Sequence, residues 1–338
     1  MKKFICTVLS VLLLCAMAAA NGKSDGDPDI VSENQKITLK WASVHPPIHP
    51  ASQMMARIAE EISEKTNGRI EIKCFPGSQL GGSKDLIRAV QKGDIDMVSE
   101  GAANFGQYVP SATIAEAPYI WRSIGHLESA LNGAFGQKIN EALVRESGMR
   151  MLGAMYYGTR HLSTSTKAIH SVADLKGKLI RVPLPPYVAF FKRLGCSTVK
   201  MSLAEVYTGM QQGMLDACEF PLGTIFTNSL QEVAKYCFLS SHTFAPTCWG
   251  MSAALFNKMS PEDRKIFIEE FSKGGEYFTK LNAENMADYR KKLEAAGVKF
   301  VEPSDADKRA MSAAAAAAVS DFPELSKGLV DKLRAAMK

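Results

Sequence analysis

Residues 70–99 read IEIKCFPGSQLGGSKDLIRAVQKGDIDMVS and contain a strand, a helix and a second strand in close succession. Apolar and β-branched residues predict strands over 70–75 and 95–99, and the segment 84–91 between them predicts a helix. A strand, a crossover helix and a strand in this order favour parallel pairing within one sheet. The stretch therefore indicates an α/β fold with a mainly parallel sheet.

The same alternation continues in both directions. Upstream, residues 37–43 (ITLKWAS) predict a strand, and an apolar stripe from Met55 to Ile62 predicts a helix that ends at Asn67-Gly68. Further strands are predicted over 148–155, 178–182, 198–201 and 214–219, with a helix over 205–212. A second α/β unit therefore occupies about residues 125–250.

A long helix follows these two units. Pro261 suits the first helical turn and Gly297 suits the end, so the helix would run to Ala296 and measure roughly 50 Å. A helix of that length is expected to brace both units. Six consecutive alanines, Ala313–Ala318, predict a final helix, because alanine has the highest helix propensity.

Composition places the chain among globular proteins. It has 338 residues, of which 46% are hydrophobic and 22% charged, enough for one large or two medium domains. The formal net charge is +5, and the basic residues form no dense block. Composition therefore excludes a disordered or fibrous chain, and charge gives nucleic-acid binding little support.

The first twenty residues predict an export signal. Two lysines precede an apolar run that ends in Ala18-Ala19-Ala20, which is the order of charge, apolar core and cleavage site in signal peptides. The run is shorter than the roughly 20 residues that span a bilayer, and we expect cleavage near Ala20. Lipid attachment at Cys15 is the alternative, which the large Leu14 before it disfavours.

Five cysteines lie beyond this signal. They are widely spaced, odd in number and surrounded by residues typical of strand interiors: Cys74, Cys196, Cys218, Cys237 and Cys248. We expect buried free thiols, with up to two disulfides as the alternative. No CxxC pair or Cys/His cluster indicates a zinc site.

The segment His45-Pro46-Pro47-Ile48-His49-Pro50 places two histidines four residues apart. That spacing suits a metal on a helix, but three prolines exclude an intact helix through both histidines. We therefore interpret the segment as a rigid loop after the first strand, presenting its backbone and one side chain to a cleft.

No catalytic or nucleotide-binding motif is recognisable. The chain lacks a Gly-x-Ser-x-Gly elbow and a cysteine in a catalytic signature. Gly77–Ser83 is rich in glycine and precedes a helix, but it lacks the ending of a phosphate-binding loop. We expect a tight loop with Ser83 as the helix N-cap, ligand contact being the alternative. No catalytic residue, metal or cofactor is therefore predicted.

Two arginines are candidate ligand-binding residues. Arg181 lies inside the apolar strand 179–182, where an unpaired guanidinium would cost several kcal/mol, so a carboxylate of the protein or of a ligand must pair with it. Arg160 follows a strand in a turn that contains Gly158, the position where ligands of α/β sheets usually bind. The planar guanidinium fork suits two-pronged binding of a carboxylate.

Short segments with a distinctive order run from residue 68 onward. They are Gly68–Ile72 with Phe75–Gly81, Gly93–Met97, Ala117–Tyr119, Asp174–Pro183, Glu205–Tyr207 with Gln211–Gly213, and Leu215–Pro221. Each segment is weak alone. Together they resemble the periplasmic solute-binding proteins of tripartite ATP-independent periplasmic (TRAP) transporters, the dicarboxylate-binding-protein (DctP) family.

The resemblance implies two α/β lobes, joined by crossing strands and a long helix, that close over a small organic acid and deliver it to membrane permease subunits. It places lobe 1 mainly at 37–155 and lobe 2 mainly at 156–250, after a signal at 1–20 and a flexible terminus at 21–36. The crossing strand, long helix and C-terminal helices occupy 251–338. A monomeric periplasmic protein without enzymatic activity is expected.

The resemblance also assigns site residues. The carboxylate-clamping arginine of the family falls on Arg181, and a second ligand-facing arginine falls on Arg160. Further pocket positions carry over to Val44, His45, Glu100, Gly101, Leu203 and Trp249.

One departure concerns the ligand. The family usually has Gln-Glu-Asn-Pro where this chain has Cys218-Glu219-Phe220-Pro221, so Phe220 replaces an asparagine that helps to hold the carboxylate. Beside Leu203 and Trp249, Phe220 predicts a monocarboxylate with an apolar part, such as a 2-oxo acid, a hydroxy acid or an amino-acid-like compound. A dicarboxylate or sugar acid, a role with an ATP-driven importer, a sensory role and a secreted hydrolase using Glu100 or His45 remain alternatives.

Overall fold

The strands of the protein share one continuous sheet. The structure is a computed structural model that describes residues 35–165 and 167–322, and within these residues nine strands occur in the order β2-β1-β3-β8-β4-β7-β5-β6, with β9 beside β8. Their bounds are β1 Ile37–Ser43, β2 Ile70–Phe75, β3 Met97–Gly101, β4 Met149–Thr164, β5 Leu179–Val182, β6 Ser197–Lys200, β7 Ala217–Pro221, β8 Tyr236–Ser252 and β9 Lys299–Val301. The predicted export signal lies outside the described residues.

Parallel pairs lie toward the two ends of the sheet, and antiparallel pairs lie in its middle, where the short strand β9 also pairs in parallel with β8. Strand β1 pairs in parallel with β2 and β3, and β5 pairs in parallel with β6 and β7. The long strands β4 and β8 pair with each other antiparallel and contact β7 and β3. The predicted mixed α/β fold with crossing strands is therefore confirmed, and β4 and β8 join the two parallel parts.

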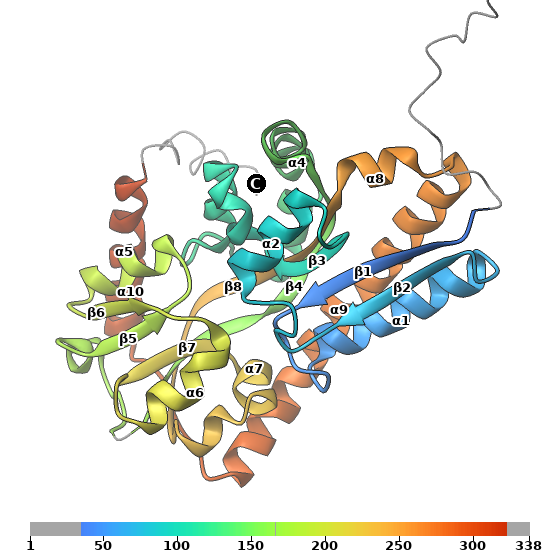
Figure 1. Cartoon of the computed structure of the whole chain (residues 1–338). Coiled ribbons are helices and arrows are strands. Elements are labelled where there is room, and N and C mark those ends of the chain that lie inside the picture. Colours follow the sequence, from blue (N-terminus) through green and yellow to red (C-terminus); the bar gives the residue numbers. More distant parts are fainter. Residues whose placement is uncertain (1–34, 166, 323–338) are drawn as a thin grey trace, which may run out of the picture.

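Helices flank the sheet on its faces (Figure 1). The α-helices are α1 Pro50–Lys65, α2 Ser83–Lys92, α3 Ile124–Leu131, α4 Ala134–Ser147, α5 Pro185–Arg193, α6 Leu203–Gln211, α7 Leu222–Thr227, α8 Ala253–Lys258, α9 Pro261–Ala295 and α10 Asp305–Ala318. Short 3₁₀ helices are η1 Ala102–Gln107, η2 Pro110–Glu116, η3 Val172–Leu175, η4 Leu230–Glu232 and η5 Val319–Asp321. Among the described residues, no helix combines the length and apolar character needed to cross a bilayer.

The predicted long helix is confirmed as α9, which has 35 residues and packs on both parts of the molecule (Figure 1). Gly274 of α9 lies against Ile58 of α1, and Tyr289 of α9 lies against Gly223 of α7. The expected lobe boundaries at 155/156 and 250/251 fall inside β4 and β8, and this division of the chain stays a prediction.

Local chemistry explains where helices begin. His49 caps α1, because its Nδ1 accepts a hydrogen bond from the amide of Ala51 at 3.0 Å and Pro50 occupies the first turn. The prediction that Ser83 caps α2 is wrong. Gly82 occupies the N-cap with extended backbone angles, and Ser83 is the first helical residue, which leaves its hydroxyl free to face a cavity.

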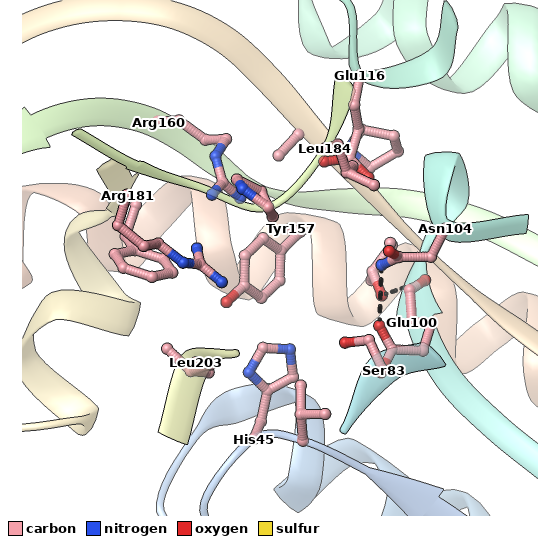
Figure 2. A pocket seen from close by; sticks show the side chains of 17 residues that line it. His45, Ser83, Glu100, Asn104, Glu116, Tyr157, Arg160, Arg181, Leu184 and Leu203 are labelled. Carbon is pink, nitrogen blue, oxygen red and sulfur yellow. Dashed lines mark hydrogen bonds between the residues drawn. The ribbon is translucent and has the colours of Figure 1, made fainter. Parts of the chain in front are cut away.

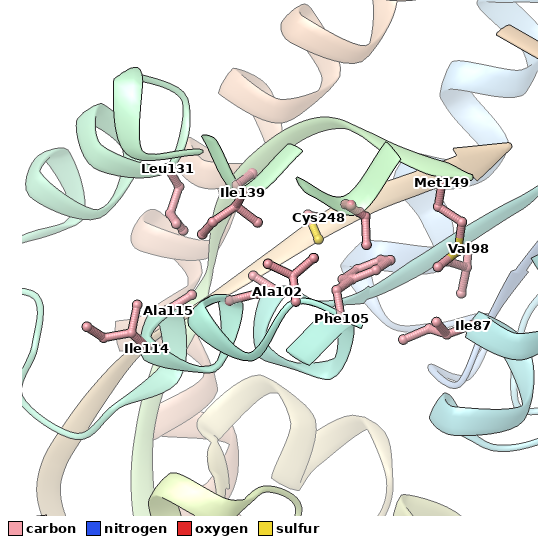
Figure 3. Close-up of a cluster of buried hydrophobic side chains, with 14 of the residues drawn as sticks. Ile87, Val98, Ala102, Phe105, Ile114, Ala115, Leu131, Ile139, Met149 and Cys248 are labelled. Carbon is pink, nitrogen blue, oxygen red and sulfur yellow. The ribbon is translucent and has the colours of Figure 1, made fainter. Parts of the chain in front are cut away.

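Buried apolar side chains form a core on each side of the sheet. Figure 3 shows one cluster, in which Phe105, Val98 and Met149 pack with Cys248 and Ile139. All five cysteines beyond the signal are free thiols, and all but Cys74 are buried. The expectation of free thiols is therefore confirmed, and these side chains act as small apolar groups.

Candidate functional site

A cleft opens between the ends of β1, β3, β5 and β7 and the middle of the long strands β4 and β8. Its inner part has about 560 Å³ of space free of protein atoms, and an adjoining outer part has about 1020 Å³. The two parts share the lining residues Val44, Ser83, Asn104, Arg181, Pro183 and Leu203, so they form one continuous cleft. A concave site lined by apolar side chains and a few polar and charged groups is typical of small-molecule binding.

Most of the residues predicted for the site line the inner cavity. They are Val44, His45, Glu100, Gly101, Arg160, Arg181, Leu203 and Phe220. Their contact with a ligand stays a prediction, but the structure brings them to one place from six separate segments of the chain.

Trp249 does not lie in this cavity. Its side chain is 2% exposed and packs edge-to-face against Trp41, with ring centroids 6.0 Å apart, and against Phe271 of α9 at 5.0 Å. The expectation that Trp249 faces the ligand is therefore not met by the structure, because this ring belongs to the core between the sheet and α9.

Arg181 carries a buried charge that forms no direct ion pair with a carboxylate in the described part of the chain. The residue is 4% exposed, and its Nε donates a hydrogen bond to the carbonyl of Met201 at 2.9 Å. Its Nη1 is buried without a hydrogen-bond partner among those residues. Burial lowers the pKa of Arg181 to about 10, a sign that its charge lacks full compensation. An anion in the cavity would complete the site.

Arg160 is already paired within the protein. Its Nη2 donates to Glu219 Oε1 at 2.7 Å and to the carbonyl of Glu219 at 2.9 Å. Glu219 is fully buried and also contacts His242 Nε2 at 3.2 Å. Arg160 therefore has a carboxylate of the protein as its partner, although its side chain also lines the cavity.

Phe220 supports both arginines. Its ring centroid lies 4.9 Å from Cζ of Arg181 and 5.5 Å from Cζ of Arg160, and the residue is 3% exposed. Guanidinium groups at such distances from an aromatic ring gain cation–π attraction. The Phe220 ring therefore packs against the guanidinium groups of Arg160 and Arg181. This role does not by itself require an apolar ligand.

Polar groups form the wall opposite Arg181. Figure 2 shows Glu100, Ser83 and Asn104 across the cavity from Arg181, with Tyr157 and His45 between them. Asn104 Nδ2 donates to Glu100 Oε2 at 3.1 Å. Sequence reasoning missed Asn104, Glu116 and Tyr157 as lining residues, because they lie in three segments that no motif connects, and it favoured a capping role for Ser83.

His45 and His49 stack with their ring centroids 4.4 Å apart, and His45 also lies beside Tyr157 at 5.1 Å. Burial lowers the pKa of His45 to about 4, and the nearby charge of Arg160 adds to this effect. His45 is therefore neutral at pH 7. In residues 35–165 and 167–322 no group of three or more His, Cys, Asp and Glu side chains is placed to hold a metal ion.

A two-part α/β fold with a buried cation in the cleft between its strand ends defines a solute-binding protein. The sequence model of the bacterial extracellular solute-binding protein family 7 (DctP) matches residues 41–324, and the chain belongs to this family. This finding confirms the resemblance drawn from the sequence.

Relatives of known name and structure agree with this assignment. The chain is 31% identical over 262 residues, covering 77% of this chain and 79% of the relative, to the 2,3-diketo-L-gulonate-binding periplasmic protein YiaO of Escherichia coli. A TRAP periplasmic solute-binding protein from Roseobacter denitrificans with bound L-galactonate superposes with a TM-score of 0.83 at 30% identity, covering 88% of this chain and 99% of that chain. One from Xanthobacter autotrophicus with bound β-D-galacturonate gives 0.81 at 28% identity, with the same two coverages.

Proposed function

We propose that this protein captures a hydroxylated monocarboxylate of the sugar-acid type in the inner cavity and holds its carboxylate on Arg181. The observation that carries the proposal is the buried Arg181 guanidinium, which has no carboxylate partner in the described residues and faces a cavity. A two-pronged ion pair with a ligand carboxylate satisfies this charge. Relatives that bind galactonate and galacturonate support the same class of ligand.

The polar wall supports hydroxyl groups on the rest of the ligand. Ser83, Glu100 and Asn104 lie opposite Arg181, and Glu100 Oε1 has no hydrogen-bond partner in the described residues, so a ligand with only apolar atoms there would leave this oxygen unsatisfied. This polar wall favours a sugar acid over the monocarboxylate with an apolar part that Phe220 suggested. The latter remains the second candidate, because Leu184, Leu203 and Phe220 also line the cavity.

We infer that the cycle is binding and release without chemistry. Ligand enters the cleft, the two lobes close, and the exclusion of water strengthens the ion pair with Arg181. The closed form then meets permease subunits of a TRAP transporter, the partners with which this family works. We propose a monomer, with residues 1–20 removed on export to the periplasm.

A calorimetric panel tests the ligand class. D-galacturonate, D-glucuronate, L-galactonate, pyruvate, lactate, leucine and succinate are titrated into the purified mature chain. We expect a sugar acid to bind with the highest affinity. Tight binding of leucine or a 2-oxo acid, with no binding of any sugar acid, would favour the second candidate instead.

The Arg181→Ala variant tests the carboxylate clamp. Loss of a buried charged partner costs about 3–5 kcal/mol, so we expect affinity to fall by at least about 100-fold. Arg193→Ala is the matched control, because Arg193 pairs with Asp321 outside the cavity and its loss should leave ligand affinity unchanged. Unchanged affinity in Arg181→Ala would exclude this assignment.

A further inference from the structure

Glu100 has one oxygen with a hydrogen-bond partner and one without. Its Oε2 accepts a hydrogen bond from Asn104 Nδ2 at 3.1 Å (Figure 2), and the Ser83 hydroxyl and the Gly101 amide are close enough to act against the rise in the pKa of this carboxyl group. Its Oε1 is buried and has no hydrogen-bond partner in the described part of the chain, although the residue is only 3% exposed and lines the inner cavity. A buried polar atom without a partner is unusual and points to a missing group.

A second buried carboxyl group lies beside the first and is better supplied with donors. Glu116 Oε1 accepts from the amide of Ala103 at 3.4 Å, and Oε2 accepts from the Tyr187 hydroxyl at 3.1 Å. A Cβ atom on Gly101 would lie 2.5 Å from Glu116 Oε1, so the glycine permits Glu116 to approach the end of β3 this closely.

Two buried carboxyl groups this close do not ionise equally. Burial raises the pKa of Glu116 as well, but there the charge of Arg160 and the donors of Tyr187 and Ala103 act against the rise. Burial, aided by the charge of Glu116, raises the pKa of Glu100 to about 8. When two environments make the pKa values of neighbouring carboxyl groups differ, the group with the higher pKa holds the proton. Here that group is Glu100.

We propose that Glu100 is protonated at neutral pH and donates a hydrogen bond from Oε1 to a hydroxyl oxygen of the bound acid. A neutral Glu100 adds no negative charge to a cavity that must admit an anion, and it recognises an oxygen acceptor rather than an ammonium group. The inference rests on the proposed function and deepens it, because it selects hydroxylated acids against amino acids and links their binding to pH.

The charged and titratable groups around Glu100 come from the elements that surround the cleft. They are His45 after β1, Lys84, Asp85 and Arg88 of α2, Glu116 of η2, Tyr157 and Arg160 of β4, Arg181 of β5 and Cys248 of β8. His45 has a pKa of about 4 and Arg181 one of about 10, and burial raises the pKa of Tyr157 and Cys248. Glu100, with a pKa of about 8, is therefore expected to titrate between about pH 6 and pH 9.

Calorimetry with D-galacturonate and L-galactonate across that pH range tests the proposal. Binding to the protonated form keeps affinity constant up to about pH 8 and lowers it by up to about tenfold per pH unit above that value. The isosteric Glu100→Gln variant keeps an N–H donor at this place, so its affinity should stay within about threefold of wild type at pH 7 and lose the decline. Affinity of the wild type that does not fall up to about pH 9.5, or a decline that persists in Glu100→Gln, would overturn the proposal.

Glu116→Gln is the matched control: it should retain a decline of affinity, moved to lower pH, because the charge of Glu116 helps to raise the pKa of Glu100. Infrared difference spectra of ligand-free wild type minus Glu100→Gln provide a readout that needs no ligand. We expect the carbonyl band of a protonated carboxyl group at pH 7 and its loss at higher pH. Binding of sugar acids without this band contradicts the inference alone. The band without binding of any sugar acid contradicts the proposed function and with it the donation to a ligand.

Discussion

Arg160 Nη2 donates to Glu219 Oε1 at 2.7 Å, and both side chains are buried between β4 and β7. The pair balances its own charge, with His242 as a further contact of Glu219. Arg181, on the neighbouring strand β5, has no such pair in the described residues. The two arginines therefore differ: Arg160 forms an ion pair within the protein, and Arg181, which forms none in the described residues, is the arginine that we propose for the ligand.

Glu219→Gln removes the charge that balances Arg160. A buried charge that loses its partner costs about 3–5 kcal/mol, so we expect the free energy of unfolding to fall by about 3 kcal/mol in urea titrations. The control is Glu302→Gln, whose partner Arg290 is at the surface, and it should change stability by less than about 0.5 kcal/mol. An Arg160→Met/Glu219→Leu double variant should recover most of the loss, and equal loss in the single and double variants would argue against this cause.

Neighbouring glycines of α9 are expected to respond in opposite ways to alanine. A Cβ on Gly274 would lie 2.5 Å from Ile58 Cδ1, whereas a Cβ on Gly275 would make ordinary contacts of 3.7 Å or more with Trp249. We expect Gly274→Ala to destabilise by about 1–2 kcal/mol through overpacking. Gly275→Ala should stabilise by about 0.5–1 kcal/mol through helix propensity.

Thermal or urea unfolding of the two single variants measures these changes. Adding Ile58→Val to Gly274→Ala removes the methyl group nearest to the new Cβ and should restore part of the stability. If both alanine variants stabilise the protein to the same extent, α1 and α9 do not pack as closely at Gly274 as the structure describes.

The sequence predicted correctly those helices and strands that depend on the residue pattern of their own segment. The strand over 70–75 and the start of the long helix at Pro261 agree with the structure, because alternation and capping act within each segment. The strand predicted to end at residue 155 instead continues as β4 to Thr164. Polar residues such as Arg160 and a glycine at 158 suggested a turn, but pairing with β7 and β8 buries this segment as strand.

The residues of the site were likewise predictable where local sequence marks them and not where tertiary packing places them. Arg181 was identified from its own strand, because an arginine among apolar residues must find a partner. Glu116 and Asn104 gave no such signal, since they lie in 3₁₀ helices and reach the cavity only through the packing of η1 and η2. Trp249 was assigned to the pocket by resemblance, which transfers a position along the strand but not the packing that decides whether a ring faces the cavity or α9.

Buried neutral histidines predict a loss of stability in acid. Burial lowers the pKa of His161 to about 3, with the charges of His242 and Arg290 adding to the effect. Unfolded histidine binds its proton near pH 6.5, so the unfolded state gains protons first and stability falls as pH decreases from about 6.5 toward 3. Each such group contributes up to about 1.4 kcal/mol per pH unit over that window.

Unfolding in urea at a series of pH values measures this slope. His161→Gln should reduce the slope below pH 6.5 by about one proton. A slope that is the same in wild type and His161→Gln would show that this ring is not held neutral by burial.

Replacement of Phe220 separates support of the arginines from contact with an apolar ligand. The Phe220→Leu variant keeps an apolar side chain but removes the ring that lies 4.9 Å from Arg181 Cζ. If the ring acts by holding the guanidinium, loss of a cation–π contact worth about 0.5–2 kcal/mol should lower affinity for every carboxylate ligand by about 2- to 30-fold. If it acts by packing on an apolar part, only ligands that carry such a part should weaken. Calorimetry with D-galacturonate and leucine distinguishes the two, and Phe226→Leu, which removes a ring 5.6 Å from Lys292 Nζ outside the inner cavity, should leave both affinities unchanged.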